Sequence, residues 1–202
     1  AAMFALPQSE AGAAAYRHHT GRQKPPAEPL DEAALIVGRR GGKSRVLALI
    51  GTYLAAFIDY TPHLARGEVA TVAIIAADRR QARAIFRYVQ GWFRQVPMLA
   101  EMVVSETADS MTLNNRVAIE IHTASFRVTR GYTFAAVLGD EVAFWRTDET
   151  SANPDEEILD AIRPGLSTIP GALLLIASSP YAKRGALYAA HRDHFGRDGS
   201  GL

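Results

Sequence analysis

Residues 33–53 read Ala-Ala-Leu-Ile-Val, then Gly38-Arg39-Arg40-Gly41-Gly42-Lys43-Ser44, then Arg-Val-Leu-Ala-Leu-Ile-Gly-Thr-Tyr. The first apolar run is too short for a helix, whereas the segment that opens at Lys43 is compatible with one. A strand, a glycine-rich basic turn and a helix in this order predict a phosphate-binding loop. The first glycine of the strict pattern would fall at Val37, so the glycine at 38 comes one residue late. A basic turn before an ordinary helix is the alternative interpretation.

Each part of this stretch has a chemical use in holding a nucleoside triphosphate. Glycines allow successive backbone N–H groups to point at the β-phosphate, and the start of the helix adds its positive dipole end. Lys43 would neutralise the β- and γ-phosphate oxygens, and the Ser44 hydroxyl would bind Mg²⁺. We therefore expect ATP and Mg²⁺ as ligands, held by residues Gly38, Arg39, Arg40, Gly41, Gly42, Lys43, Ser44 and Arg45.

Composition limits the class of protein. The chain has 202 residues, 48% of them hydrophobic, which suits one domain with a real core. Its 22 basic and 21 acidic residues leave a net charge of +1, so overall charge indicates nothing about nucleic acid. Without cysteine, the chain has no disulfide, thiolate metal site or cysteine nucleophile. No apolar run approaches about 18 residues, so we expect no membrane span, and the Ala-rich start lacks the positive n-region of a signal peptide.

The pattern of apolar runs predicts an α/β fold. Continuous apolar runs at 69–77, 133–138 and 172–177 are typical of parallel strands buried on both faces. Helical spacing separates them and predicts helices at 45–60, 79–96, 155–162 and 185–194. Three shorter runs at 103–104, 111–113 and 117–122 predict an antiparallel hairpin addition. The expected fold is thus a mainly parallel central sheet flanked by helices.

Two acids follow the run at 133–138, which ends in Gly139-Asp140-Glu141. Open α/β sheets bind their ligands at the carboxyl ends of strands. Asp140 would hold Mg²⁺ through water, and Glu141 would polarise the attacking water, which explains two adjacent carboxylates where a metal alone needs one. Placed about a hundred residues after a phosphate loop, these acids become candidate metal-binding and catalytic residues.

A pair of hydroxyl side chains, Ser178 and Ser179, follows the last apolar run. At the carboxyl end of a strand beside the nucleotide, they would sense the γ-phosphate. A plain strand-ending turn would need only the proline at 180.

Three further positions are candidates with ordinary alternatives. Arg22 and Gln23 lie in a segment with two prolines and a glycine, where they would contact adenine or form part of an exposed linker. Arg130 precedes a glycine just before the 133–138 run and would act as an arginine finger, or be a surface arginine. Arg39 and Arg40 compete for that role in cis. The candidate catalytic residues are Glu141, Lys43, Arg130 and Arg39.

The motifs taken together resemble one family. They are the loop Gly-Arg-Arg-Gly-Gly-Lys-Ser, Asp78-Arg-Arg-Gln-Ala82, Leu-Gly-Asp-Glu, and Ile-Ala-Ser-Ser-Pro followed by Arg184-Gly185-Ala-Leu-Tyr188. This set resembles the ATPase domain of tailed-bacteriophage large terminase subunits over nearly the whole chain. The resemblance implies an N-terminal segment at 1–32, an ASCE-type (RecA-like) P-loop core at 33–195 and a tail or linker at 196–202. It makes Ser178 and Ser179 the coupling motif, and the ring of subunits that it implies would let Arg130 act as a finger in trans.

The resemblance also implies a biological setting. Such a motor drives double-stranded DNA into a procapsid, with a small terminase subunit, the portal protein and sister subunits in a ring as partners and no membrane. It works in the host bacterial cytoplasm, transiently at the portal vertex. The nuclease domain that the family normally adds is not expected from this chain. Two rival classes are another P-loop translocase or helicase, and a nucleotide-binding module that switches without turnover.

Overall fold

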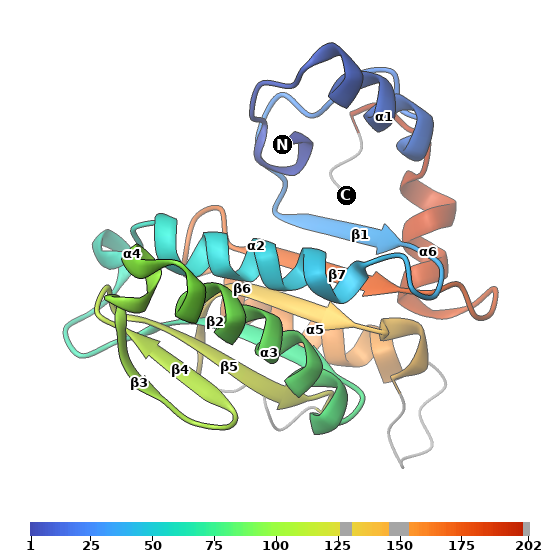
Figure 1. Cartoon of the computed structure of the whole chain (residues 1–202). Helices are drawn as coiled ribbons and strands as arrows, with labels where there is room; N and C mark the ends of the chain where they lie inside the picture. The colour runs from blue at the N-terminus through green and yellow to red at the C-terminus, as the bar shows by residue number, and fades with distance from the viewer. Residues whose placement is uncertain (126–130, 146–153, 200–202) are drawn as a thin grey trace.

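One sheet organises the computed structural model, which describes residues 1–125, 131–145 and 154–199. In these residues seven strands form the sheet in the order β1-β7-β6-β2-β5-β4-β3 (Figure 1). The strands are β1 (Glu32–Ile36), β2 (Ala70–Ala76), β3 (Val103–Glu106), β4 (Ser110–Leu113), β5 (Val117–Thr123), β6 (Thr133–Asp140) and β7 (Leu173–Ser178). The helices are α1 (Glu10–Thr20), α2 (Lys43–Phe57), α3 (Arg79–Gln95), α4 (Pro97–Ala100), α5 (Pro154–Leu166) and α6 (Gly185–His194). Short 3₁₀ turns are η1 (Ala2–Phe4), η2 (Thr61–His63) and η4 (Val142–Phe144).

The sheet is parallel except at one end. Strands β1, β7, β6, β2 and β5 pair in parallel, whereas β4 is antiparallel to β5 and β3 to β4. This confirms the expected fold class, a mainly parallel sheet with a short antiparallel addition. One detail differs: β5 belongs to both parts, because it pairs with β2 along its whole length as well as with β4.

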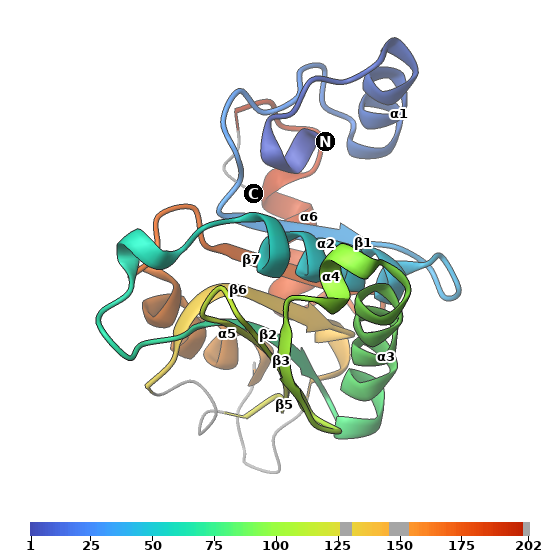
Figure 2. The ribbon, with the colours of Figure 1, turned by 60° about the vertical axis from the view of Figure 1, so that its left-hand side comes forward.

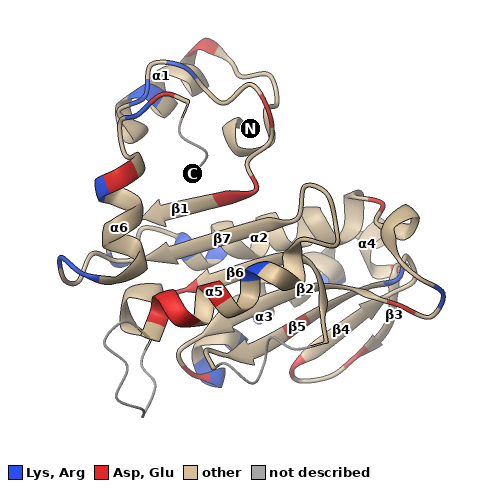
Figure 3. Ribbon diagram, turned by 180° about the vertical axis from the view of Figure 1, so that it is seen from behind, with Lys and Arg blue, Asp and Glu red and all other residues tan. Residues whose placement is uncertain are grey.

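The core lies on both faces of the central strands. Every residue of β2 and β7 is buried, as expected for continuous apolar runs in parallel strands. Helices α2 and α3 cover one face, and the view from behind shows α5 and α6 on the other (Figures 1 and 3). Helix α2 approaches β6 closely, since a Cβ on Gly51 would lie 2.7 Å from Leu138 Cδ1. This layering holds the carboxyl ends of β1, β7 and β6 at one edge.

Helix α2 carries more apolar surface than the sheet buries. Leu47 and Leu54 face the core, while Val46, Leu49 and Phe57 are exposed. The broad apolar pattern expected for this helix therefore includes an outward face as well as an inward one.

Helix α5 runs further than the sequence suggested. A helix ending before Pro164 was expected, yet α5 continues to Leu166. The proline falls in the last turn of the helix, where its missing N–H removes one terminal hydrogen bond. The next residue, Gly165, packs against Phe134, whose ring a Cβ would meet at 2.7 Å.

The two ends of the chain meet beyond the edge of the sheet. Figure 2 shows α1 and the end of α6 above β1. The Gly196 N–H donates to the Thr20 carbonyl at 3.0 Å, and the Gln23 N–H donates to Asp198 Oδ1 at 2.9 Å. In the described part of the chain, no helix combines the length and apolar character needed to cross a bilayer.

Candidate active site

The loop between β1 and α2 has the backbone expected for holding phosphate. Gly42 (φ +85°) and Arg40 (φ +59°) both adopt left-handed conformations, which turn the chain sharply into α2. Only one backbone bond, from the Gly41 N–H to the Gly38 carbonyl at 3.2 Å, closes the loop on itself. Residues 38–42 are exposed, and α2 begins directly after them at Lys43. The exposed loop therefore leads directly into a helix N-terminus, whose first N–H groups lack partners within the helix, which is an anion-binding arrangement.

Val37 explains the departure from the strict loop pattern. A Cβ on Gly41 would lie 2.3 Å from Val37 Cγ1. The valine side chain thus occupies the space beside Gly41, and only a residue without a side chain fits there. The loop therefore still requires glycine at position 41, because Val37 leaves no room there for a side chain.

Lys43 is buried, and its ammonium group lies where three strand ends meet. Nζ donates to the Val37 carbonyl at 3.2 Å, the Gly38 carbonyl at 3.4 Å and Ser179 Oγ at 3.0 Å. It also forms an ion pair with Glu141 Oε1 at 3.3 Å. The structure therefore brings residues that directly follow β1, β6 and β7 to one cation.

Asp140 and Ser44 form the part of the site that suits a hard cation. Ser44 Oγ lies 3.5 Å from Asp140 Oδ2, at the limit of a hydrogen bond. Among the described residues, the buried Asp140 Oδ1 has no hydrogen-bond partner. Burial, and then the nearby Glu141 charge, raise the pKa of Asp140 above its ordinary value. An unpaired buried carboxylate oxygen beside a hydroxyl fits Mg²⁺, which prefers oxygen ligands.

Glu141 has an unusual backbone and a well-held side chain. Its φ of +51° is left-handed, which is uncommon for a residue with a side chain. Oε2 lies 3.1 Å from Ser178 Oγ and accepts from the Ser179 N–H at 3.2 Å. With Oε1 on Lys43, both carboxylate oxygens have partners. The carboxylate therefore points to the phosphate loop from the neighbouring strand end.

The topology makes this meeting possible. Strand β7 lies between β1 and β6, and the three are parallel, so their carboxyl ends face the same way (Figure 1). The loop after β1 and the acids after β6 are thus one strand apart, which is the ASCE arrangement. Ser178 bridges them, since its carbonyl accepts from the Val37 N–H at 3.1 Å and its Oγ from the Ala143 N–H at 3.3 Å.

The other candidate residues lie elsewhere or outside the description. Arg39, Arg40 and Arg45 are exposed around the loop. Arg22 is buried and donates to the His194 carbonyl at 3.3 Å, at the end of α6. Figures 1 and 2 show the segment between α1 and β1 away from the phosphate loop, so its contact with adenine stays a prediction. Arg130 falls outside the described residues, and its role as a finger also stays a prediction.

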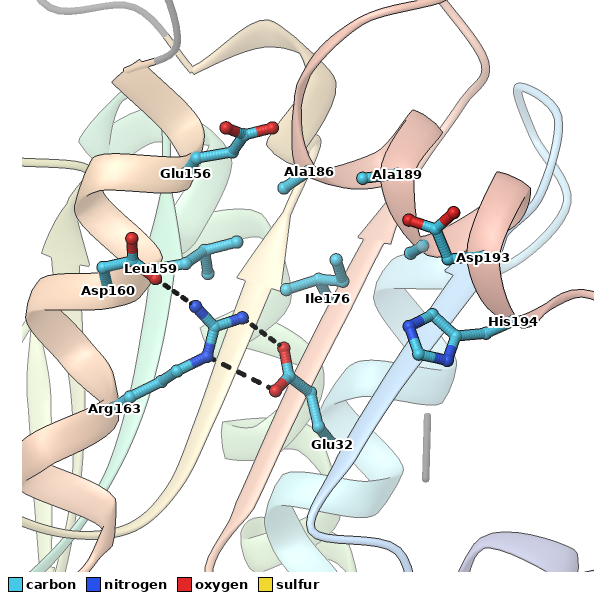
Figure 4. Close-up of a pocket in the computed structure, with 11 residues that line it drawn as sticks. Glu32, Glu156, Leu159, Asp160, Arg163, Ile176, Ala186, Ala189, Asp193 and His194 are labelled. Carbon is cyan, nitrogen blue, oxygen red and sulfur yellow. Dashed lines mark hydrogen bonds and ion pairs between the residues drawn. The ribbon is translucent and has the colours of Figure 1, made fainter. Parts of the chain in front are cut away.

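A separate pocket of about 270 Å³ lies between α5 and α6 (Figure 4). Leu159 and Ile176 form part of its apolar lining, and Arg163 crosses its edge to Glu32 at 2.8 Å and to Asp160. Among the described residues that line it, none belongs to the phosphate loop or the acid pair. It is therefore distinct from the site built around Lys43.

Two structural partners in this region were not identified from the sequence. The Trp145 indole Nε1 donates to the Asp140 carbonyl at 2.9 Å. Asp155 Oδ2 accepts from the Ala186 N–H at 2.8 Å at the start of α6, and a Cβ on Gly185 would lie 2.3 Å from the same oxygen. This explains the glycine in the Arg-Gly-Ala-Leu-Tyr motif. The tryptophan five residues after Asp140 was the only sequence signal for the contact of its indole with the Asp140 carbonyl. The contact between Asp155 and the start of α6 has no local signal in the sequence.

Comparison with solved structures bears on the fold. The HK97 bacteriophage large terminase has a TM-score of 0.55 and 21% identity over 74% of this chain and 29% of its own. The ATPase domain of the Thermus phage P74-26 large terminase has a TM-score of 0.54 and 19% identity, covering 89% of this chain and 68% of that one. An arginine-to-alanine mutant of that domain gives 0.53 and 19%, covering 90% and 69%. The fold is similar to that of phage large terminase ATPase domains.

This similarity confirms, at the level of fold, the resemblance seen in the motifs. No protein-family model matches the sequence, and no curated protein matches it significantly. The chain spans less than a third of the HK97 protein and about two thirds of the Thermus phage domain. At about 20% identity the comparison concerns the architecture.

Proposed function

We propose that this chain is the ATP-hydrolysing motor domain of a viral DNA-packaging terminase. One observation carries the proposal: the Lys43 ammonium lies at the meeting point of the phosphate loop, Glu141 and Ser179. A structural lysine would need only one such partner. A cation that joins a phosphate-binding loop, a carboxylate base and a hydroxyl sensor is what hydrolysis of a phosphoanhydride requires. The likeness in fold to terminase ATPase domains supports the choice of motor.

The loop residues supply the binding step. Backbone N–H groups of residues 38–42 and the start of α2 would bind the β-phosphate of ATP, while Lys43 would move its hydrogen bonds from loop carbonyls to phosphate oxygens. Ser44 and Asp140 would hold Mg²⁺, which supplies charge neutralisation on the phosphates when bound. Glycine at 41 lets the loop take this course past the Val37 side chain.

Glu141 supplies the base. Its carboxylate would orient the attacking water and accept the water's proton. Ser178 and Ser179 contact this carboxylate through Oγ and N–H, at 3.1 and 3.2 Å. These contacts would change when the Glu141 carboxylate turns toward the water. The resulting movement of Ser178 and Ser179 would be transmitted along the chain from β7 to α6. An arginine would stabilise the charge of the transition state, Arg130 from a neighbouring subunit or Arg39 or Arg40 within the same chain.

The proposal includes the motor's surroundings. Its track would be double-stranded DNA, and its partners sister subunits in a ring, the portal protein and a small terminase subunit. It would work in the host bacterial cytoplasm, transiently at the portal vertex of the procapsid. ATP and Mg²⁺ are the proposed ligands.

The test is steady-state phosphate release from MgATP, with and without double-stranded DNA, over a range of protein concentrations. We expect turnover that DNA stimulates and that rises more steeply than linearly with concentration, because subunits act in a ring. Binding of ATP without turnover would favour the switching module instead. Strand separation of a duplex would favour a helicase. Absence of ATP binding would refute the proposal.

A further inference from the structure

The segment after β6 folds back on itself, and one buried side chain holds it there. Trp145 is 3% exposed, and its indole Nε1–H donates to the Asp140 carbonyl at 2.9 Å. That carbonyl belongs to the peptide group that joins Asp140 to Glu141. The indole therefore fixes the plane of the one peptide that sets the direction of both acids.

This peptide needs a fixed partner, because the residue after it is in a costly conformation. Glu141 has φ +51° and ψ +43°, and left-handed backbone costs a residue with a side chain about 1–2 kcal/mol. Such conformations persist only where the surroundings determine them. Two backbone bonds, Phe144 N–H to the Glu141 carbonyl at 2.8 Å and Trp145 N–H to the Val142 carbonyl at 3.0 Å, return the chain toward β6.

The indole ring is positioned as closely as its N–H group. A Cβ on Gly139 would lie 3.1 Å from Trp145 Cη2 and 3.2 Å from Cζ2. The ring thus packs closely against the backbone at 139, directly before the two acids, and leaves little room for a side chain there. Packing on one side and a hydrogen bond on the other leave the indole a single orientation.

We propose that Trp145 is a positioning residue for ATP hydrolysis, whose indole N–H holds the Asp140–Glu141 peptide so that Glu141 faces the phosphate loop. The inference rests on the proposed function, since it assigns a role within that reaction. The described contacts of the Trp145 side chain are with Asp140 and Gly139 rather than with the loop that would bind ATP, so the indole would act through the acids. Its loss should therefore affect turnover much more than ATP affinity.

The test compares the chain's two tryptophans in the same substitution. Trp145→Phe removes the indole N–H that Asp140 uses. Trp92→Phe is the matched control, because Trp92 lies on α3 and its Nε1 has no hydrogen-bond partner among the described residues. We expect Trp145→Phe to lower kcat about 10- to 100-fold, the loss typical of misplacing a catalytic group by about 1 Å. The Kd for ATP should stay within about 3-fold, and Trp92→Phe should change neither constant.

Two results would overturn the inference: a kcat of Trp145→Phe within about 2-fold of the wild type, or equal losses in kcat and ATP affinity. If Trp145→Phe does not fold, Gly139→Ala replaces it, since the added Cβ would press on the Trp145 ring and on Val142 Cγ2, each 3.1 Å away, while the indole N–H is kept. The same split between kcat and Kd is expected, and an unchanged kcat would again contradict the role.

A measurement without ATP separates this inference from the proposed function. In ¹⁵N-labelled protein the two indole N–H signals can be assigned with the Trp92→Phe variant. We expect the Trp145 signal to exchange with D₂O more slowly than the Trp92 signal, and Gly139→Ala to shift it. A wild type that does not hydrolyse ATP would refute the proposed function alone. A fast-exchanging Trp145 indole in a wild type that does hydrolyse ATP would refute the positioning role alone.

Discussion

The loop after β1 and the segment after β6 meet at one ion pair, Lys43 to Glu141, yet they are built in opposite ways. The loop at 38–42 is exposed and closed by a single backbone bond. The segment at 141–145 is anchored by side chains, through the Trp145 indole and the Ser178 hydroxyl, with Val142 and Trp145 buried. The first can reshape around a ligand, whereas the second holds a chemical group still.

The difference suggests a division of labour that mutations can separate. Changes in the exposed loop should act mainly on ATP affinity, because its backbone is the binding surface. Changes in the anchored segment should act mainly on turnover, because they alter the orientation of the Glu141 carboxylate. A variant that affects both constants equally would break the comparison.

The largest effect is expected for Glu141→Gln. Glutamine keeps the shape of the side chain but cannot accept the water's proton, and a general base contributes about 10²- to 10⁴-fold to rate. We expect kcat to fall within that range while ATP still binds. Phosphate release and binding of a fluorescent ATP analogue measure the two effects. Glu101→Gln, an exposed acid after α4, is the control. Normal turnover in Glu141→Gln would remove this residue from the catalytic role.

Lys43→Ala should act next most strongly, on the other side of the comparison. Each hydrogen bond to a charged group is worth about 1.5–3 kcal/mol, and 1.4 kcal/mol is a factor of ten. Losing the ammonium should therefore weaken ATP binding by about 100-fold or more. Isothermal titration measures the affinity, and Lys24→Ala, an exposed lysine near the N-terminal helix, serves as control. Unchanged ATP affinity in Lys43→Ala would contradict the phosphate-loop assignment.

The same contrast explains what could be predicted from the sequence. Lys43, Ser44, Asp140 and Glu141 follow apolar runs with local patterns, and the parallel order of those runs places them at one edge. The structure brings these four together, although their roles in catalysis stay predictions.

Contacts between distant segments could not be predicted in this way. The bond from the Ala143 N–H to Ser178 joins segments 35 residues apart, and Asp155 meets the start of α6 across 31. No periodicity encodes such contacts, because they depend on how finished elements pack. Arg22 is a further example: its hydrogen bond to the His194 carbonyl at the end of α6 has no signal in the sequence, while its contact with adenine stays a prediction.

A third prediction uses the exposed loop's one packing constraint. Gly41→Ala adds a Cβ where Val37 Cγ1 would lie 2.3 Å away. Overpacking costs about 1–3 kcal/mol, so ATP affinity should fall about 10-fold. The double variant Val37→Gly with Gly41→Ala frees that space and should recover most of the affinity. If the double variant binds ATP no better than Gly41→Ala alone, the valine is not the cause.

The smallest expected effect is on the free energy of unfolding, and it comes from Asp140, directly before the anchored segment at 141–145. Burial, and then Glu141, raise the pKa of Asp140, so the folded state binds the Asp140 proton more tightly than the unfolded state does. The ionised carboxylate therefore costs folding free energy at neutral pH. That cost disappears as the pH falls through the raised pKa toward the ordinary value of 3.8. Asp140→Asn removes the charge, so without nucleotide and Mg²⁺ we expect its Tm to exceed that of the wild type by about 2–4 °C, or about 1 kcal/mol.

This difference in Tm should shrink as the pH falls, without a change of sign. On acidification the wild type protonates Asp140 and recovers the lost stability, so the two melting curves should converge below the raised pKa. Thermal unfolding followed by circular dichroism from neutral pH down to about pH 4, near the ordinary carboxyl pKa, tests this. Adding MgATP at neutral pH should reverse the order, because only the wild type keeps the carboxylate that would hold the cation. If Asp140→Asn were less stable than the wild type at neutral pH, the ionised Asp140 carboxylate would stabilise the folded state instead of destabilising it.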